Sequence, residues 1–164
     1  MSAIAKTLCG VALAGLLASP VAAQGLVTHR DLSLAMAEKM ADAALAECKS
    51  KGYDSSVAVL DRDGQTLVLM RGEHQTAQDG EMARRKAYTA LMFRRPSSDF
   101  AKRTYEDKTL MPQRQLADIV ALSGGVPVKL GDQTIGAVGS AGSSQETGEL
   151  CASAGIAAVA GELK

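Results

Sequence analysis

The chain has 164 residues with 18 basic and 18 acidic side chains, so its formal net charge is zero. This balance excludes binding of nucleic acid through a strongly basic surface, and the absence of tryptophan with only 3% aromatic residues argues against a base-stacking platform. The length fits one domain, whose core must be built from aliphatic residues, alanine and methionine.

Residues 1–23 have the pattern of a signal peptide. Lys6 supplies the positive charge, Leu8–Ala18 is an apolar run of suitable length, and Val21-Ala22-Ala23 places small residues before a cleavage site. The run is too short for a stable membrane span. We therefore predict an exported protein, periplasmic or secreted, with a single domain over residues 24–164. The alternative is an uncleaved apolar anchor.

The first predicted helix lies near the start of the mature chain. Apolar residues recur at helical spacing over Leu34–Leu45, and either Asp31 or Ser33 is placed to cap the N-terminus. Gly52 favours the end of the helix, because glycine readily adopts the left-handed conformation found there.

A β-hairpin is predicted next. Val57–Leu60 is a short apolar strand, Asp61–Gly64 is typical of a tight turn, and Gln65–Arg71 is the returning strand. The polar segment Glu73–Asp79 that follows is predicted to be a loop.

The middle of the chain is more polar. A second helix is predicted over Gly80–Phe93, and Arg94–Ser98 ends it. A short helix through Ala101 follows, then a polar, irregular segment over residues 104–118. Ile119–Leu122 is apolar and is interpreted as a strand.

A second hairpin is predicted from residue 124 to residue 140. Gly131-Asp132 stands between two short apolar segments, as a hairpin turn does. Gly124 and Gly125 supply backbone freedom at its entry. The second strand is rich in glycine and alanine, which lets a helix, another backbone or a ligand come close.

The chain ends in a predicted alanine-rich helix over residues 149–163, with Ser143 or Ser144 as its N-cap. The order of elements is helix, hairpin, helix, short helix, strand, hairpin, helix. It predicts an α+β fold with an antiparallel sheet of about five strands, packed with the N- and C-terminal helices.

Cys48 and Cys151 are the cysteines of the predicted mature chain, and both fall on or beside predicted helices. In an oxidising compartment two thiols often form a disulfide. They also fit two separate buried thiols that act as small apolar groups. The sequence leaves both readings open, and it contains no Cys-x-x-Cys pattern for a metal.

Four segments together resemble the GlcG/HbpS-like family of small haem-binding proteins, whose domain recurs at the C-terminus of PduO-type proteins. They are the opening Leu32-Ser33-Leu34, the hairpin Val57–Gly64, the helix end Lys86–Ser97 and the Gly-Gly-Val-Pro block at Gly124–Pro127. The resemblance implies a profilin-like α+β domain, usually oligomeric, with haem or a related tetrapyrrole as ligand. The chain departs from the family pattern after Arg71, where it has Gly-Glu-His-Gln.

Haem iron takes a His, Met, Tyr or Cys ligand, and its propionates favour Arg or Lys. His74 lies in the loop beside Arg71 and before a basic stretch, so it is the candidate iron ligand, although a solvated loop histidine fits the sequence as well. The candidate haem-binding residues are His74, Arg71, Arg84, Lys86, Tyr88, Tyr105, Met111, Gly124 and Gly125.

The main functional hypothesis is therefore an exported protein that stores, buffers or presents haem or another tetrapyrrole. The alternative is a protein that binds a small organic acid, or an accessory protein of an oxidative pathway. A third hypothesis is a catalyst acting on a small organic acid with Lys86, Arg95 or Tyr88 in its pocket. Nucleophile-elbow, Walker and zinc-protease motifs are absent from the sequence, so no catalytic residue is assigned. The alanine-rich helix and glycine-rich strand favour a homo-oligomer.

Overall fold

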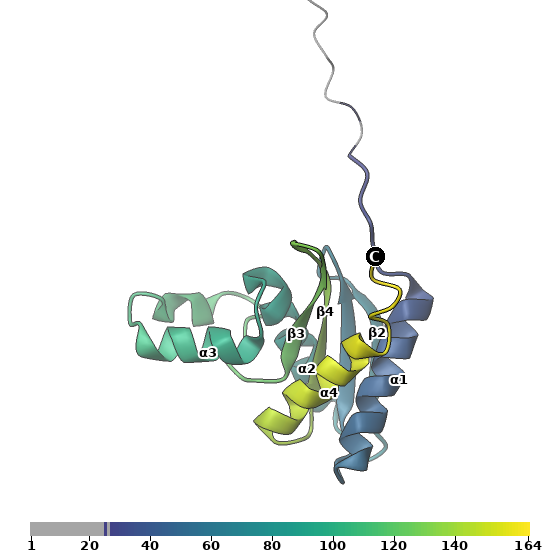
Figure 1. Ribbon diagram of the computed structural model, residues 1–164. Coiled ribbons are helices and arrows are strands. Elements are labelled where there is room, and N and C mark those ends of the chain that lie inside the picture. The colour runs from purple at the N-terminus through teal and green to yellow at the C-terminus, as the bar shows by residue number, and fades with distance from the viewer. Residues whose placement is uncertain (1–24, 26) are drawn as a thin grey trace, which may run out of the picture.

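The computed structural model describes residue 25 and residues 27–164 (Figure 1). The predicted signal peptide, residues 1–23, lies outside the described residues. Within the part that is described, no helix has the length and apolar character needed to cross a membrane.

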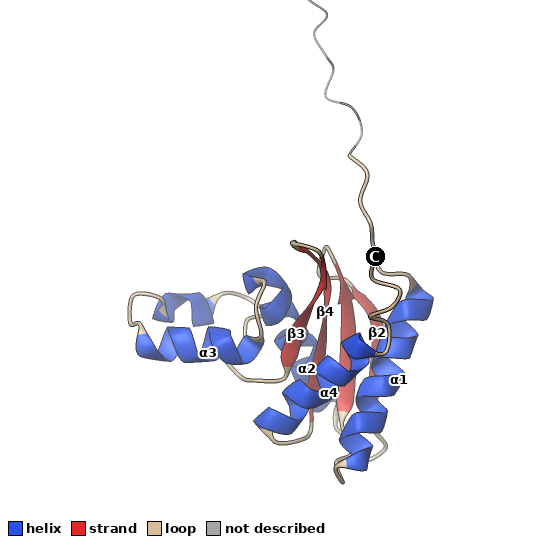
Figure 2. Ribbon diagram, viewed as in Figure 1, coloured by secondary structure: helices blue, strands red, loops and turns tan. Residues whose placement is uncertain are grey.

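Two antiparallel hairpins form one four-stranded sheet, with the strand order β2-β1-β4-β3 (Figure 2). The first hairpin consists of β1 (Ser56–Asp61) and β2 (Thr66–Arg71), and the second consists of β3 (Gly125–Leu130) and β4 (Gln133–Ala141). The inner strands β1 and β4 pair with each other along their length. Both predicted hairpins are confirmed.

The sheet is covered on both faces. Helices α1 (Leu34–Ser50) and α4 (Gln145–Ala157) lie against one face, and α2 (Ala77–Phe93) lies behind the other (Figure 1). Alternate residues of β1 explain the two layers. Val57 and Val59 belong to the core cluster with α1 and α4, whereas Leu60 packs with the alanines of α2.

Glycine lets α2 approach the sheet at very short range. A Cβ added at Gly139 would overlap the carbonyl oxygen of Ala83, and one added at Gly125 would overlap the carbonyl oxygen of Lys86. The expectation that small residues in the second hairpin permit close backbone approach is therefore confirmed, and the partner of these strands is α2.

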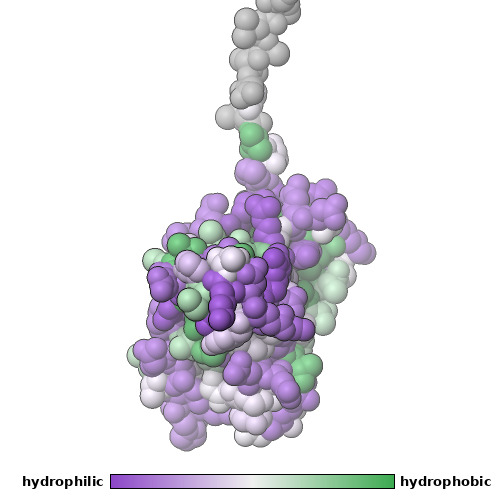
Figure 3. Space-filling model, turned by 90° about the vertical axis from the view of Figure 1, so that its left-hand side faces the viewer, coloured by the Kyte–Doolittle hydropathy of each residue, from purple (hydrophilic) through white to green (hydrophobic). Residues whose placement is uncertain are grey.

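An arm leaves the sheet after α2. It consists of α3 (Ser97–Glu106) and a 3₁₀ helix (Met111–Gln115), and it extends to one side of the molecule (Figure 1). The rings of Phe93 and Phe100 stack with centroids 4.2 Å apart and fix its root. Viewed from this side, the surface is mostly hydrophilic with scattered apolar patches (Figure 3). The arm contains more helix than the prediction of a short helix through Ala101 and an irregular segment after it.

The prediction of a strand over Ile119–Leu122 is wrong, so the sheet has four strands instead of about five. This segment is bonded to side chains of α2 instead of to a strand. Arg85 Nη2 donates to the carbonyl oxygen of Ile119 (2.8 Å), and the backbone N–H of Val120 donates to Thr89 Oγ1 (2.9 Å). Side-chain partners thus replace the ladder that an apolar run normally requires.

Helix boundaries follow their capping residues. Ser33 caps α1 and Ser144 caps α4, each chosen from the two candidates in the sequence. Helix α2 begins at Ala77, three residues earlier than predicted, because Thr76 and Asp79 form a capping box. Helix α4 ends earlier than the predicted residue 163, and turns follow it.

Cys48 and Cys151 form a disulfide that joins α1 to α4, with 5.4 Å between their Cα atoms. Both residues are fully buried. Of the two readings that the sequence leaves open, the structure has the disulfide.

Candidate functional site

An open groove of about 540 Å³ lies where the end of α1, the start of β1 and the loop after β2 meet. We call it the His74 groove. It is lined by Leu45, Lys49, Gly52, Tyr53, Asp54, Ser55, Arg71, Gly72, Glu73 and His74. The structure therefore brings His74 and Arg71, two of the predicted site residues, to one place.

Asp54 organises the loop that carries His74. Its Oδ2 accepts a hydrogen bond from the backbone N–H of His74 (2.7 Å) and lies 3.2 Å from His74 Nδ1. A Cβ at Gly72 would overlap the same carboxylate, so glycine is required for the close approach. The segment Gly72–Gln75, where the chain departs from the family pattern, is thus held in a defined conformation by the carboxylate of Asp54.

Gln75 fixes the other side of the loop. Its Nε2 donates to the carbonyl oxygen of Asp54 (2.8 Å), while Arg71 Nη1 donates to the carbonyl oxygen of Gln75. Gly142, at a φ of +97°, leaves room for the Gln75 side chain. The base of the loop is held by these contacts, and the His74 side chain remains 84% exposed.

The groove offers the chemistry that a metal-bearing anionic ligand needs. When Nδ1 of His74 faces Asp54, Nε2 is the ring nitrogen left to bind a metal, as in many carboxylate–histidine–metal arrangements. Lys49 and Arg71 supply two cations to the lining, and Leu45 and Tyr53 supply apolar surface. Glu73 opposes an anion in the same groove. The residues present fit a haem: the histidine would hold the iron and the two cations would pair with the propionates.

Lys86, Gly124 and Gly125 form a separate, buried group between α2 and the second hairpin. Lys86 is 5% exposed, and its Nζ donates to the carbonyl oxygen of Ser140 (3.0 Å). Burial lowers the pKa of Lys86. These residues do not line the His74 groove.

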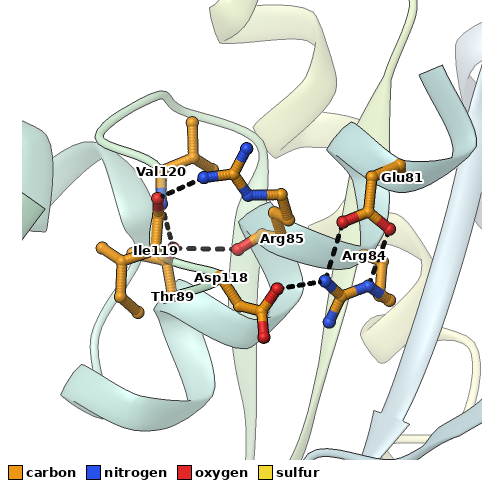
Figure 4. Close-up of polar contacts among 7 residues, drawn as sticks. All are labelled: Glu81, Arg84, Arg85, Thr89, Asp118, Ile119 and Val120. Carbon is orange, nitrogen blue, oxygen red and sulfur yellow. Dashed lines mark hydrogen bonds and ion pairs between the residues drawn. The ribbon is translucent and has the colours of Figure 1, made fainter. Parts of the chain in front are cut away.

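Arg84 is engaged in a third place, on the outer side of α2 (Figure 4). It bonds Glu81 at 2.7 Å and 2.9 Å and Asp118 at 2.6 Å. The hydrogen bond from Arg84 lowers the pKa of Glu81, and the same contact raises the pKa of Arg84. The Arg84 guanidinium is hydrogen-bonded to two carboxylates. Its contact with Asp118 holds the loop that carries this residue against α2.

The predicted aromatic and methionine ligands are scattered. The Tyr88 ring packs over Gly64, where an added Cβ would lie 2.8 Å from Cε2. Tyr105 lies on the arm, 63% exposed, with the guanidinium of Arg114 3.8 Å above its ring. Met111 is also on the arm and exposed. None of the three lines the His74 groove.

A second, larger groove of about 700 Å³ lies between α3 and α4, and its lining includes Ser98, Ser123, Glu146 and Glu149. Ser123 Oγ donates to Glu149 Oε2 (2.7 Å) across it. Its charged lining residues are both acids, and no histidine, cysteine, methionine or tyrosine lines it. It is therefore a poorer fit for haem than the His74 groove. Among the described residues, no cluster of three or more His, Cys, Asp or Glu side chains is arranged to hold a metal ion.

Sequence reasoning missed Asp54, Lys49 and Tyr53. Asp54 lies four residues after the end of α1, and its partner His74 follows 20 residues later. Only the pairing of β1 with β2 brings the two together, because the hairpin returns the chain to its starting end. A local pattern contains no signal for that contact.

Comparison with known proteins gives consistent matches. Residues 32–157 match the family model described as haem degrading protein HbpS-like. The chain is 30% identical over 123 residues to the uncharacterized 15.0 kDa protein of the dhaT-dhaS intergenic region of Citrobacter freundii, covering 74% of this chain and 87% of that one. It is 32% identical over 108 residues to protein GlcG of Escherichia coli K12, covering 66% and 79%.

Solved structures match nearly the whole described domain. A double mutant of Streptomyces reticuli HbpS superposes with a TM-score of 0.77 at 37% identity, over 85% of this chain and 96% of that chain. The complex of PduOC with haem superposes with a TM-score of 0.71 at 21% identity, over 79% and 95%. The second likeness shows a shared fold.

Proposed function

The chain belongs to the HbpS-like family, and from this premise we propose that it binds haem or a related tetrapyrrole in the His74 groove. The family description names haem, and the structural neighbour PduOC was solved as a haem complex. The observation in this chain that carries the proposal is the joint presence of His74, its acceptor Asp54 and the cations Lys49 and Arg71 in one groove.

Each residue has a defined role in this proposal. Nε2 of His74 would hold the iron, while Asp54 holds Nδ1 and the ring orientation through the contact at 3.2 Å. Arg71 and Lys49 would pair with the propionates, and Tyr53 and Leu45 would supply apolar contacts to the ligand. Bound haem supplies an iron centre whose redox and oxygen chemistry belongs to the cofactor. The groove is open, which suits a protein that accepts and releases its ligand.

We also propose that the protein is exported and acts in the periplasm or outside the cell, where it stores, buffers or presents haem. The signal-peptide pattern of residues 1–23 is one support. The disulfide between Cys48 and Cys151 is a second, since disulfides persist mainly in oxidising compartments.

The proposal is tested by titrating haemin into the chain of residues 24–164 and recording the absorption spectrum. We expect a sharp Soret band that saturates near one haem per chain. His74→Ala should abolish the sharp band, whereas His29→Ala, which removes a histidine outside the groove, should leave it unchanged. Asp54→Asn should weaken binding while keeping the chain folded. A broad, non-saturating change in the unmodified protein, with thermal stabilisation by organic acids instead, would refute the haem proposal.

A further inference from the structure

Lys86 is a buried amine without an acidic partner in contact. It lies in the middle of α2, 5% exposed, and the carbonyl oxygen of Ser140 is its hydrogen-bond acceptor at 3.0 Å. The ion pairs among the described residues do not include it. Burial lowers its pKa, and Asp79 compensates only in part. Haem binding in the His74 groove makes no use of this group.

An amine in this position is costly to keep. Burying a charged ammonium without a counterion opposes folding, and a methionine of similar length would avoid that cost. Buried lysines with lowered pKa values are the ones that serve as bases and as amines for imine formation, because more of the neutral form is present.

Gly124 packs against the end of the Lys86 side chain, and Gly148 lies on the other side of Gly124 and of the Ser140 carbonyl. A Cβ at Gly124, whose φ is +123°, would lie 3.1 Å from Nζ and 2.6 Å from the carbonyl oxygen of Ser140. A Cβ at Gly148 would lie 3.4 Å from that oxygen and 3.6 Å from Gly124 Cα. We call Lys86, Gly124, Ser140 and Gly148 the Lys86 cluster.

The Lys86 cluster lies next to the larger groove between α3 and α4. Ser123, which precedes Gly124, and Glu149, which follows Gly148, both line that groove and are joined by the 2.7 Å hydrogen bond between their side chains. This hydrogen bond therefore joins the two chain segments that lead from the groove to the amine. The groove of about 700 Å³ is thus lined by the chain neighbours of Gly124 and Gly148.

We propose that Lys86 is a nucleophilic amine that forms an imine with a small carbonyl compound, an aldehyde or a 2-oxo acid, which enters from the groove between α3 and α4. In this step the lone pair of neutral Nζ attacks the carbonyl carbon and forms a C–N bond. The two protons of the amine leave with the carbonyl oxygen as water, and a C=N bond remains. Nothing is oxidised or reduced, and hydrolysis reverses the reaction.

The test is reductive trapping. The chain of residues 24–164 is incubated separately with acetaldehyde and with pyruvate in the presence of cyanoborohydride, which reduces the imine to a stable amine. Intact mass and peptide mapping then locate the adduct. We expect one adduct per chain, on Lys86, ahead of the exposed lysines Lys39 and Lys51. Lys86→Arg keeps the donor to Ser140 and should lose the adduct.

A second variant keeps the test decisive if Lys86→Arg fails to fold. Gly148→Ala adds a methyl group on α4 within ordinary contact distance of the Ser140 carbonyl oxygen and of Gly124 Cα. It should reduce labelling of Lys86 while the helix remains folded. Gly80→Ala, another glycine inside a helix with only ordinary contacts to Leu69, is the matched control and should label like the unmodified chain. Labelling spread evenly over exposed lysines, or unchanged labelling of Lys86 in Gly148→Ala, would overturn the proposal.

Discussion

Removing the disulfide between Cys48 and Cys151 should lower the stability of the domain substantially. The bridge joins residues 103 positions apart and ties α1 to α4 on one face of the sheet. In the chain-entropy treatment, a cross-link that closes a loop of about 100 residues restricts the unfolded chain by about 4.7 kcal/mol. Domains of this size have unfolding free energies of about 5–15 kcal/mol, so the loss is between about 30% and nearly all of the total.

The assay is urea unfolding at equilibrium, followed by circular dichroism, on the oxidised protein and on the Cys48→Ala/Cys151→Ala double variant. Both cysteines are fully buried, so the double variant also loses packing around the sulfur atoms. We expect its unfolding free energy to be about 3–5 kcal/mol lower. The control is a reductant, which should destabilise the unmodified protein and leave the double variant unchanged. A difference below about 1 kcal/mol, with equal urea dependence, would refute the reasoning.

Four further predictions concern the capping of α2, its packing against the sheet, and the assembly. Thr76→Ala removes the cap of α2 and should cost about 1 kcal/mol in urea unfolding. Hydrogen bonds from Thr76 lower the pKa of Asp79 in the folded chain. The ionised Asp79 therefore stabilises the fold at pH values above the ordinary pKa of a carboxyl group. This stabilisation is lost as the pH falls through the lowered pKa. A pH series on Asp79→Ala should show a weaker acid dependence, and an unchanged one would contradict this. Gly139→Ala places a Cβ against the backbone of α2 and should cost about 3 kcal/mol or more, because neither backbone has room to move; a variant with normal stability would show that α2 can retreat. We also expect a homo-oligomer, and light scattering that gives the mass of one chain at micromolar concentration would contradict it.

Much of the fold follows from local patterns. The turns at Asp61–Gly64 and Gly131-Asp132 each separate two apolar segments, and both predicted hairpins are present. Ser33 and Ser144 cap helices as their residue type favours. The cases that failed depend on partners far away in sequence. Ile119–Leu122 has the composition of a strand, but side chains of Arg85 and Thr89 in α2 take the hydrogen bonds of its backbone that a neighbouring strand would otherwise make.

The site shows the same division. The sequence identifies Arg71 at the end of a strand and His74 in the loop after it as chemistry-bearing residues, and the structure places both in one groove. It also suggests Tyr105 and Met111, which lie on the arm and do not line that groove. A residue type limits what a side chain can bind, but only the fold decides which side chains meet.

By itself, therefore, the sequence determined the family, the two hairpins, the helix caps and the candidate histidine, because each depends on residues close together in the chain. The tertiary structure alone decided that Asp54 orients His74, that Cys48 and Cys151 are bonded, and that Lys86 is buried beside Gly124. Those contacts join residues 20 to 103 positions apart or depend on α2 lying against the second hairpin. No local pattern encodes them, since they arise only when the sheet brings its strands and helices together.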